Sequence, residues 1–502
     1  MRATKRLGLG LASLWCAMAQ ADYRDDVGYR QLQQLLGSAA PTGAGVNVVL
    51  AEASTVPQSD KLRYPVFAPD IGQTRFSGKT FAFPGPLAST GISDHATGVA
   101  AMFFGNDSIA PGIAHIAVYN ADDWLIGLVA ASAEAPTAGA RIANHSWIGR
   151  ADGETAADIG AYLRLADRIV QRYEFIQVVG MDNGPSDSPL LGSAYNTIAV
   201  GRTDGGHNKG SDPVDSVYGG GRTRPDLVAP RSTTSGATPL VSAAAALLVE
   251  TGHSGAGKLS NAEQTITGIG QVYNAERAET VKAVLMAGAD RATDNTSTAA
   301  DIVDYRSAGH QTVNGLDDRF GAGQLDVFNS YRIIAGGEQD SIEDGGSAEL
   351  RPAGFDFDDA FGGLSSNRTA SYKITALKDL QLSAALVWNI GVADDSTLAT
   401  VLYDLDLELF DTTLQRTVGL SNSRADNSEN LWLALSGGHG YELRVVAATA
   451  GDFVWDYALA WRTEPLAAVP VPASAFPFCG ALLAFMLSRR GVRLKQQVES
   501  GG

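Results

Sequence analysis

The chain has 502 residues, which are too many for one core and predict two or three domains. Hydrophobic residues make up 45% of the chain and charged residues 19%, a composition that is typical of a globular protein and excludes a largely disordered one. The formal net charge of −17 argues against a nucleic-acid-binding surface. The same acidic balance is compatible with secretion, with solubility and with bound calcium.

The first residues have the pattern of an export signal. Three basic residues precede the apolar run 7–16, and the small-residue pattern AMAQA follows at 17–21. We therefore predict a signal peptide over residues 1–21, with cleavage after Ala19 or Ala21. The alternative is a buried N-terminal helix.

The chain has two cysteines, Cys16 and Cys479, and each lies in a terminal apolar segment. The body between these segments has no cysteine, which excludes a disulfide scaffold, a cysteine protease and a thiolate metal site.

Short apolar runs alternate with longer helical stretches from Gly45 to Ile334. The runs that we expect to form strands are 46–51, 113–119, 175–179 and 197–200. This alternation predicts an α/β domain with a doubly wound parallel sheet and helices on both faces. Sites in such sheets form at the carboxyl ends of the strands.

Three candidate residues fall at such places. Glu52 ends the run 46–51, where a carboxylate is more often a solvated or capping residue. His95 opens a stretch of small residues with helical character, where a histidine is most often bonded to the backbone. The third is a serine at the start of an Ala-rich helix, whose positive end favours a developing oxyanion. The four residues 232–235 (STTS) compete there for the role of helix cap, and capping alone leaves the choice among them open.

The serine segment resembles the Gly-Thr-Ser-Met-Ala-Thr-Pro segment of subtilisin-like serine proteases, with matches at Thr234, Ser235, Ala237, Thr238 and Pro239. Further stretches are similar to the same family and in register, at 95–100, 109–114, 225–230 and 276–287. The resemblance covers residues 45–334 and implies a subtilisin-like peptidase domain over residues 22–335.

The resemblance implies Ser235 as nucleophile, His95 as general base and Glu52 as the residue that orients this base. Acid, histidine and serine occur in the chain order of subtilisin. Glu52 stands where the family has aspartate, and its extra methylene moves the carboxylate by ~1.5 Å. Glutamate can still accept a hydrogen bond from imidazole, and the related sedolisins use it, so we expect activity.

Other roles also follow from the resemblance alone. Asn183 is the implied side-chain donor of the oxyanion hole. Ser146, Trp147 and Gly149 are implied to line the strand that pairs with an extended substrate, whereas we expect His145 to be a packed core histidine. The family pattern is broken by Thr233, which replaces a glycine, and by Met181-Asp182, which replaces an Ala-Gly pair.

Residues 347–463 alternate as strands do, and a Gly/Asp/Glu-rich joint at 336–346 precedes them. The pattern predicts an antiparallel β-sandwich, similar to the β domains that follow the catalytic domain of secreted bacterial proteases. Three acidic residues of this region could bind calcium, but we expect them to be solvated carboxylates that face outward: Asp404, Asp406 and Asp411.

Residues 466–495 have a Pro-containing start, a short apolar stretch at 476–487 and a basic tail. They resemble the PEP-CTERM sorting signals that exosortase-type enzymes of Gram-negative bacteria recognise and remove. The apolar stretch is short for a permanent transmembrane segment, which needs ~20 residues. We expect the basic tail to stay in the cytoplasm by the positive-inside rule, which leaves the body of the chain on the outer side of the membrane. The alternative is a simple tail anchor.

We therefore predict a secreted serine endopeptidase, extracellular or on the cell surface, that cleaves protein or peptide substrates through an acyl-enzyme and binds no nucleic acid. The chemistry requires no cofactor or catalytic metal, and the position of a structural calcium ion is not fixed by the sequence. The competing hypothesis is a protein of the same fold that binds extended peptides without cleaving them, which Glu52 and Thr233 support. A third hypothesis is an inert adhesion component built on the β domain.

Overall fold

The computed structural model describes residues 22–56, 63–129, 139–149, 155–184, 190–293, 295, 302, 304–346, 349–362 and 368–466. The predicted signal peptide at 1–21 lies outside the described residues, and so does the predicted sorting signal from residue 467 onward. Within the described part of the chain, none of the helices has both the length and the apolar character of a membrane span.

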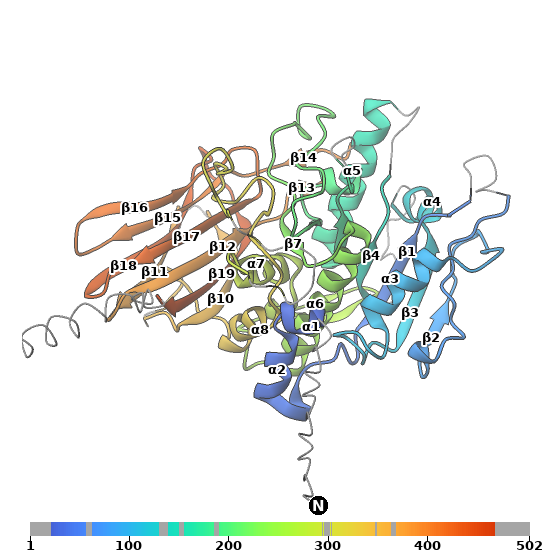
Figure 1. The fold of residues 1–502 in the computed structure, drawn as a ribbon. Helices are drawn as coiled ribbons and strands as arrows, with labels where there is room; N and C mark the ends of the chain where they lie inside the picture. Colours follow the sequence, from blue (N-terminus) through green and yellow to red (C-terminus); the bar gives the residue numbers. More distant parts are fainter. Residues whose placement is uncertain are drawn as a thin grey trace, which may run out of the picture. The chain divides into compact units, whose positions relative to one another are not determined.

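A seven-stranded sheet forms the centre of the α/β part, in the order β2-β3-β1-β4-β5-β6-β7 (Figure 1). All of its strand pairs are parallel. The strands are β1 (Asn47–Glu52), β2 (Thr80–Ala82), β3 (His115–Asn120), β4 (Ala140–His145), β5 (Ile176–Gly180), β6 (Ile198–Arg202) and β7 (Leu227–Ala229). The four predicted strand runs are confirmed, since they coincide within two residues at each start with β1, β3, β5 and β6.

The described helices surround this sheet. The α-helices are α1 (Tyr23–Asp26), α2 (Tyr29–Leu36), α3 (Asp94–Phe104), α4 (Ala121–Asp123), α5 (Ala156–Tyr173), α6 (Thr234–Ser254), α7 (Ala278–Gly288) and α8 (Val327–Gly336). The shorter helical elements are η1 (Gly37–Ala39), η2 (Thr74–Phe76), the π-helix η3 (Trp124–Val129), η4 (Leu191–Ser193) and η5 (Asn274–Glu276). A separate hairpin joins β8 (Glu263–Ile266) to β9 (Gly270–Tyr273).

The two faces of the sheet bury alternate residues of each strand. In β1, Val48 and Leu50 belong to the core that α3 and α6 cover, whereas Val49 and Ala51 belong to the core that α5 covers. We call these the α3/α6 face and the α5 face. Helices on both faces leave neither side of β1 exposed, which explains why residues 48–51 within it are all apolar. The predicted doubly wound sheet is confirmed.

The C-terminal strands form two further four-stranded sheets, in the orders β10-β19-β12-β17 and β11-β18-β15-β16. Their described pairs β10·β19, β12·β17, β11·β18, β15·β18 and β15·β16 are antiparallel. The bounds are β10 (Ala353–Phe361), β11 (Thr369–Ala376), β12 (Leu380–Val387), β15 (Leu405–Asp411), β16 (Arg416–Ser421), β17 (Ser428–Leu435), β18 (His439–Ala447) and β19 (Trp455–Pro465), with the small hairpin β13 (Gly391–Val392) and β14 (Thr400–Val401) beside them. One hydrophobic core contains residues of both four-stranded sheets, so the predicted β-sandwich is confirmed.

The alternation at the start of β15 is also confirmed, because its residues are buried and half-buried in turn. Asp411 at its end, however, does not face solvent as predicted, since only 1% of this residue is exposed. Its Oδ1 accepts hydrogen bonds from the amides of Thr413 and Leu414, and its Oδ2 contacts His439 Nδ1 at 2.7 Å. The prediction of a solvated carboxylate is wrong here, because the Asp411 side chain accepts hydrogen bonds from the backbone of the turn between β15 and β16. Asp404 and Asp406 are half-buried.

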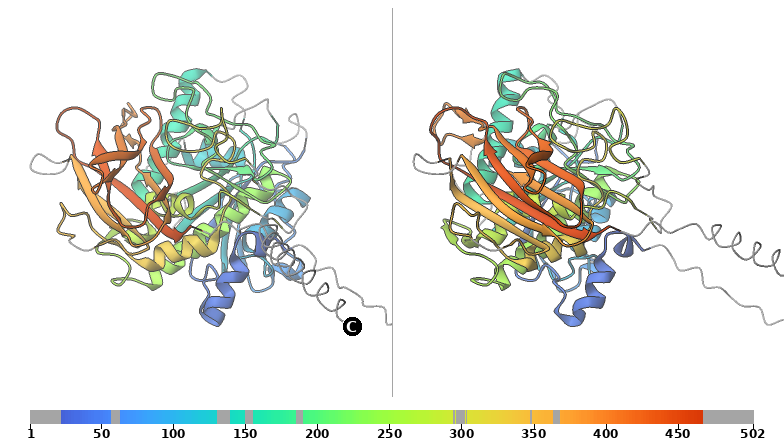
Figure 2. Two further views of the ribbon diagram at one scale, coloured as in Figure 1. Left: turned by 60° about the vertical axis from the view of Figure 1, so that its left-hand side comes forward. Right: turned by 90° about the vertical axis from the view of Figure 1, so that its left-hand side faces the viewer.

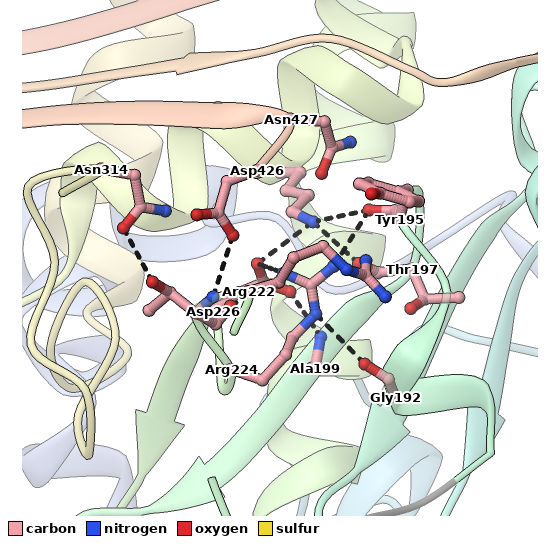
Figure 3. A network of polar contacts seen from close by, with 12 residues as sticks. Gly192, Tyr195, Thr197, Ala199, Arg222, Arg224, Asp226, Asn314, Asp426 and Asn427 are labelled. Atoms are coloured by element: carbon pink, nitrogen blue, oxygen red, sulfur yellow. Dashed lines mark hydrogen bonds and ion pairs between the residues drawn. The ribbon is translucent and has the colours of Figure 1, made fainter. Parts of the chain in front are cut away.

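The sandwich packs against the α/β part, and strands β10, β12 and β19 (orange to red in Figure 2) contribute side chains to the core of the α3/α6 face. A buried polar network adds to this contact (Figure 3). In it, Asp226 pairs with Arg224 at 3.3 Å and with Lys282 at 3.2 Å, while the Thr223 amide donates to Asp426 Oδ1 at 2.9 Å. The described residues up to Glu464 accordingly form one compact unit.

Candidate active site

A buried carboxylate and a histidine meet at the carboxyl end of β1. Glu52 is the last residue of β1 and is 1% exposed, and His95 lies on the first turn of α3. Glu52 Oε2 lies 2.8 Å from His95 Nδ1, within hydrogen-bond distance. This contact leaves His95 Nε2 as the ring nitrogen available to another group, and 40% of the side chain is exposed. The predicted contact between Glu52 and His95 is therefore present.

His95 is not the residue that caps α3. Ser93 caps the helix, and its hydroxyl accepts a hydrogen bond from the Ala96 amide at 3.1 Å. Since the cap is supplied by Ser93 and the ring of His95 contacts Glu52, the histidine is not a helix-start residue bonded to the backbone.

The electrostatics of the pair follow from its burial. Burial raises the pKa of Glu52, against the lowering effect of the bond from His95. The same bond raises the pKa of His95, against the effect of its partial burial. An imidazole with a raised pKa and one unbonded nitrogen is suited to accept a proton from a neighbouring hydroxyl.

Ser235 lies on the first turn of α6 and is half-buried. The helix is capped by Thr233, whose side chain accepts a hydrogen bond from the Gly236 amide at 3.1 Å. Capping therefore does not occupy the hydroxyl of Ser235. The backbone of Thr233 is extended, with φ −139° and ψ 150°, so this position does not require the glycine that the family has there.

The carbonyl of Ser235 is held by Ser146, which follows β4. Pro239 lies inside α6 and has no N–H group, so it cannot bond the Ser235 carbonyl four residues earlier. The Ser146 hydroxyl donates to this carbonyl instead, at 3.1 Å. Ser146 thus fixes the backbone at Ser235, a contact that the predicted role in substrate binding did not include.

Two buried polar residues extend this contact. The Asn144 side-chain amide donates to the Ser146 hydroxyl at 2.9 Å, and the Ser242 hydroxyl donates to Asn144 Oδ1 at 2.9 Å. Asn144 and Ser242 are fully buried between β4 and α6. Sequence analysis missed both, because a single asparagine in a strand and a single serine in an Ala-rich helix carry no signal of their own.

Asn183 follows β5 and contacts the start of α6. Its Oδ1 accepts a hydrogen bond from the Thr234 amide at 2.8 Å. Because that partner is a backbone N–H group, the accepting atom is the oxygen, and the amide nitrogen Nδ2 of this exposed residue is available to donate. Asn183 is thereby tied to the residue before Ser235.

The register of the sheet relates these groups to one another. Ala51 of β1 pairs with His145 of β4, so Glu52 and Ser146 are the next residues on adjacent strands. Because side chains alternate along a strand, Glu52 and Ser146 continue the rows of residues that face α3 and α6, and neighbouring strands lie ~4.8 Å apart. The structure therefore brings Glu52, His95, Ser146, Ser235 and Asn183 to one edge of the sheet.

One expected contact is absent from this edge. Although both residues are described, no hydrogen bond joins the His95 ring to the Ser235 hydroxyl. Such contacts are often long in unliganded enzymes and shorten when substrate binds.

Trp147 and His145 point to the opposite face of the sheet. Their rings lie 5.6 Å apart, and His145 also contacts Trp124 at 5.3 Å. Burial lowers the pKa of His145 to about 3, so it is neutral, as expected for a core histidine. Trp147 is 8% exposed, and its contact with substrate stays a prediction.

Gly149 lies against the Trp147 ring and Leu190. A Cβ atom at Gly149 would approach the Trp147 ring to 2.9 Å, and the Gly149 carbonyl accepts a hydrogen bond from the Leu190 amide at 3.1 Å. The close approach explains the glycine. Its place in a substrate-binding strand also stays a prediction.

Two groups of side chains among the described residues have potential metal-ligand atoms within 4.8 Å of one another: His310, Asp317 and Asp318, and Glu338, Asp340 and Asp356. Protein donors already bind carboxylates in both groups, as Lys209 binds Asp318 and Tyr372 binds Asp356 at 2.5 Å. Neither group identifies the position of a calcium ion.

No protein-family model matches the chain, and no curated protein matches it. Its structure is similar to that of the prenylagaramide maturation protease PagA, with 18% identity, 61% of this chain and 99% of that chain covered, and a TM-score of 0.39. It is also similar to the epidermin leader peptide processing serine protease EpiP from Staphylococcus aureus, with 13% identity and a TM-score of 0.35. That match covers 61% of this chain and 80% of the other chain. The pre-peptidase C-terminal domain of a Bacillus anthracis collagenase is similar over 22% of this chain and 87% of its own length, with 13% identity and a TM-score of 0.16.

Proposed function

We propose that the protein is a serine endopeptidase with Ser235 as nucleophile, His95 as general base and Glu52 as the residue that orients this base. The observation that carries the proposal is the 2.8 Å contact between Glu52 and His95 Nδ1, which leaves Nε2 for the serine. A buried carboxylate that bonds one imidazole nitrogen fixes the tautomer and stabilises the imidazolium that forms during catalysis.

In the proposed reaction the Ser235 hydroxyl attacks a peptide carbonyl while His95 accepts its proton. The oxyanion is bound by Asn183 Nδ2 and by the Ser235 amide, which lies on the first turn of α6 and has no recorded partner among the described residues. His95 then donates the proton to the leaving amine, and water releases the acyl-enzyme.

Hydrogen bonds around the nucleophile support this assignment. Ser146 holds the Ser235 carbonyl and Asn183 holds the Thr234 amide, so the backbone on either side of the hydroxyl is fixed by side chains from β4 and from the end of β5. A nucleophile fixed in this way loses little entropy when it reacts. The export of the chain, its sorting by an exosortase-type enzyme and its place on the cell surface remain part of the proposal.

A second candidate function is a peptide-binding protein of the same fold that does not cleave. The missing hydrogen bond between His95 and the Ser235 hydroxyl favours it. The first candidate accounts for more, because it gives a role to the Glu52–His95 contact together with Ser235 and Asn183 at the same edge of the sheet.

Labelling of the purified full-length chain with a fluorophosphonate probe separates the two candidates. We expect labelling of the wild type, none in Ser235→Ala and slow labelling in Glu52→Ala. Absence of labelling in a wild type whose circular dichroism shows a folded protein would favour the binding protein. Cleavage of an internally quenched peptide with both ends blocked then tests for an endopeptidase.

A further inference from the structure

Glu52 keeps one carboxylate oxygen unbonded inside the protein. Oε2 contacts His95, but Oε1 is buried and has no hydrogen-bond partner among the described residues. An unbonded carboxylate oxygen in a protein interior costs free energy, so a donor nearby is expected.

The neighbouring strand carries a matching unbonded donor. Asn120 is the last residue of β3, pairs in register with Glu52 and is 0% exposed. Its Oδ1 accepts a hydrogen bond from the Asp122 amide at 2.8 Å, and its Nδ2 has no partner among the described residues. Since the Oδ1 partner is a backbone N–H group, the unbonded atom is the donor nitrogen.

The register places these two side chains on the same face of the sheet. Val48 pairs with Ile116 and Leu50 with Val118, and all four belong to the core of the α3/α6 face. Side chains alternate along a strand, so Glu52 and Asn120 continue this row on strands that lie ~4.8 Å apart. The unbonded acceptor Glu52 Oε1 and the unbonded donor Asn120 Nδ2 thus belong to residues at paired positions of adjacent strands.

We propose that Asn120 is a positioning residue for the acid–base pair, and that its Nδ2 supplies the second hydrogen bond to Glu52, at Oε1, directly or through one water molecule. This inference rests on the proposed function. The titratable side chain that contacts Glu52 is His95, and this contact and burial set the direction of both pKa shifts. A donor to Oε1 therefore acts on the carboxylate that contacts His95.

The bond from Asn120 has a definite effect on the pair. A hydrogen bond to the ionised carboxylate favours the charged form, so losing it raises the pH at which the pair gives up its last proton. The active form has ionised Glu52 and neutral His95. Without the bond, the acid limb of the activity profile moves to higher pH.

Two substitutions isolate the donor. Asn120→Asp keeps an oxygen for the Asp122 amide and replaces Nδ2 by a second oxygen, and Asn120→Leu has a similar volume with neither group. Asn106→Asp is the matched control, because Asn106 is exposed and its Nδ2 donates to the Ser77 carbonyl at 3.2 Å, outside the site.

The measurement is the second-order rate constant for fluorophosphonate labelling between pH 5 and pH 9, a range of about two units on each side of neutrality. At pH 7 we expect Asn120→Asp to lower this rate constant roughly tenfold or more, the effect of one hydrogen bond to a charged group. Its acid limb is expected to move up by about one pH unit. Asn120→Leu shows a smaller shift of the same sign, and Asn106→Asp matches the wild type.

A double-mutant cycle distinguishes positioning from a general structural role. If Asn120 acts through Glu52, Asn120→Leu has no further effect in a Glu52→Ala background. The proposal is overturned if Asn120→Leu lowers the labelling rate constant equally in the wild type and in Glu52→Ala. It is also overturned if Asn120→Asp folds but its acid limb lies at the same pH as that of the wild type.

Failure of the proposed function gives a different result, because the wild type itself is then not labelled. NMR titration of His95 tests the role of Asn120 in that case, since it requires no catalysis. The midpoint of the His95 titration is expected to move to higher pH in Asn120→Leu, but not when Glu52 is also replaced by alanine. A midpoint that is the same in Asn120→Leu and in the wild type overturns the proposal.

Discussion

Four carboxylate–histidine pairs occur among the described residues, and the pairs formed by Glu52 and Asp411 are alike in distance and burial. In the α/β part Glu52 contacts His95 at 2.8 Å, and in the sandwich Asp411 contacts His439 at 2.7 Å. Both carboxylates are 1% exposed. The distance and the burial do not tell the pairs apart.

The other bonds of each carboxylate differ. Burial raises the pKa of Asp411, but the bonds from His439, Leu414 and Thr413 outweigh it and leave the pKa below its usual value. Glu52 accepts one bond and its pKa is raised by burial. Asp411 therefore stabilises its own turn, whereas the one hydrogen bond of the Glu52 carboxylate among the described residues is the contact with His95. A buried carboxylate with fewer donors than acceptor sites is the better candidate for catalysis.

The largest expected effect comes from removing each carboxylate in turn. Glu52→Ala is expected to lower kcat/KM for a peptide substrate by about 10³–10⁴-fold, because His95 loses its orientation and its counter-charge. Asp411→Ala is expected to leave kcat/KM near the wild-type value and to lower the melting temperature. Steady-state kinetics and thermal unfolding on both variants measure this, and a reversed pattern would reject the assignment of the catalytic pair.

Removal of the oxyanion donor is expected to have the next largest effect. Asn183→Ala lowers kcat by about 10²–10³-fold with a smaller change in KM, since Nδ2 acts on charge that develops in the transition state. The control is Asn106→Asp, which lies outside the site. A change confined to KM would show that Asn183 binds the ground state only.

The pH dependence sharpens the comparison further. The pKa of His95 is raised above its ordinary value of 6.5 by the bond to Glu52, so the ring stays protonated and inactive to a higher pH than a free histidine. The acid limb of kcat/KM is expected above pH 6.5, with a tenfold loss per pH unit below it. In Glu52→Ala the limb of the residual activity moves to lower pH. An acid limb below pH 6 in the wild type contradicts this electrostatic account.

The smallest expected effect is that of the serine that holds the nucleophile. Ser146→Ala leaves the Ser235 carbonyl without its donor and is expected to lower kcat/KM by roughly tenfold, the effect of one lost hydrogen bond. Ser383→Ala is the matched control, because the Ser383 hydroxyl also donates to a helix carbonyl, that of Ala287 at 2.8 Å, away from the site. Equal losses of activity in the two variants would mean that both act through stability alone.

Much of the fold could be predicted because its strands have distinct patterns. The unbroken apolar run before Glu52 identified a strand buried on both faces, and the alternation that starts at Leu405 identified one face of a sandwich. Asp411 was predicted wrongly, since the bonds from Thr413 and Leu414 depend on a turn whose geometry the alternation does not specify.

The site was predicted in part. Sequence motifs predicted that Glu52 and His95 meet, and the two side chains are in contact. The motifs left the cap of α6 open, and the structure assigns it to Thr233. Asn144 and Asn120 could not be found, because each is a single asparagine at or near the end of a strand. Their place at the site depends on how β3 and β4 pair with β1, and this register cannot be read from a single sequence.

The most direct test of the central claim is to locate the adduct that a fluorophosphonate probe forms. Digestion of the labelled full-length protein and peptide mass spectrometry are expected to find one modified residue, Ser235, with no adduct in Ser235→Ala. An adduct on another residue, or a folded wild type that forms none, would contradict the assignment of Ser235 as the nucleophile.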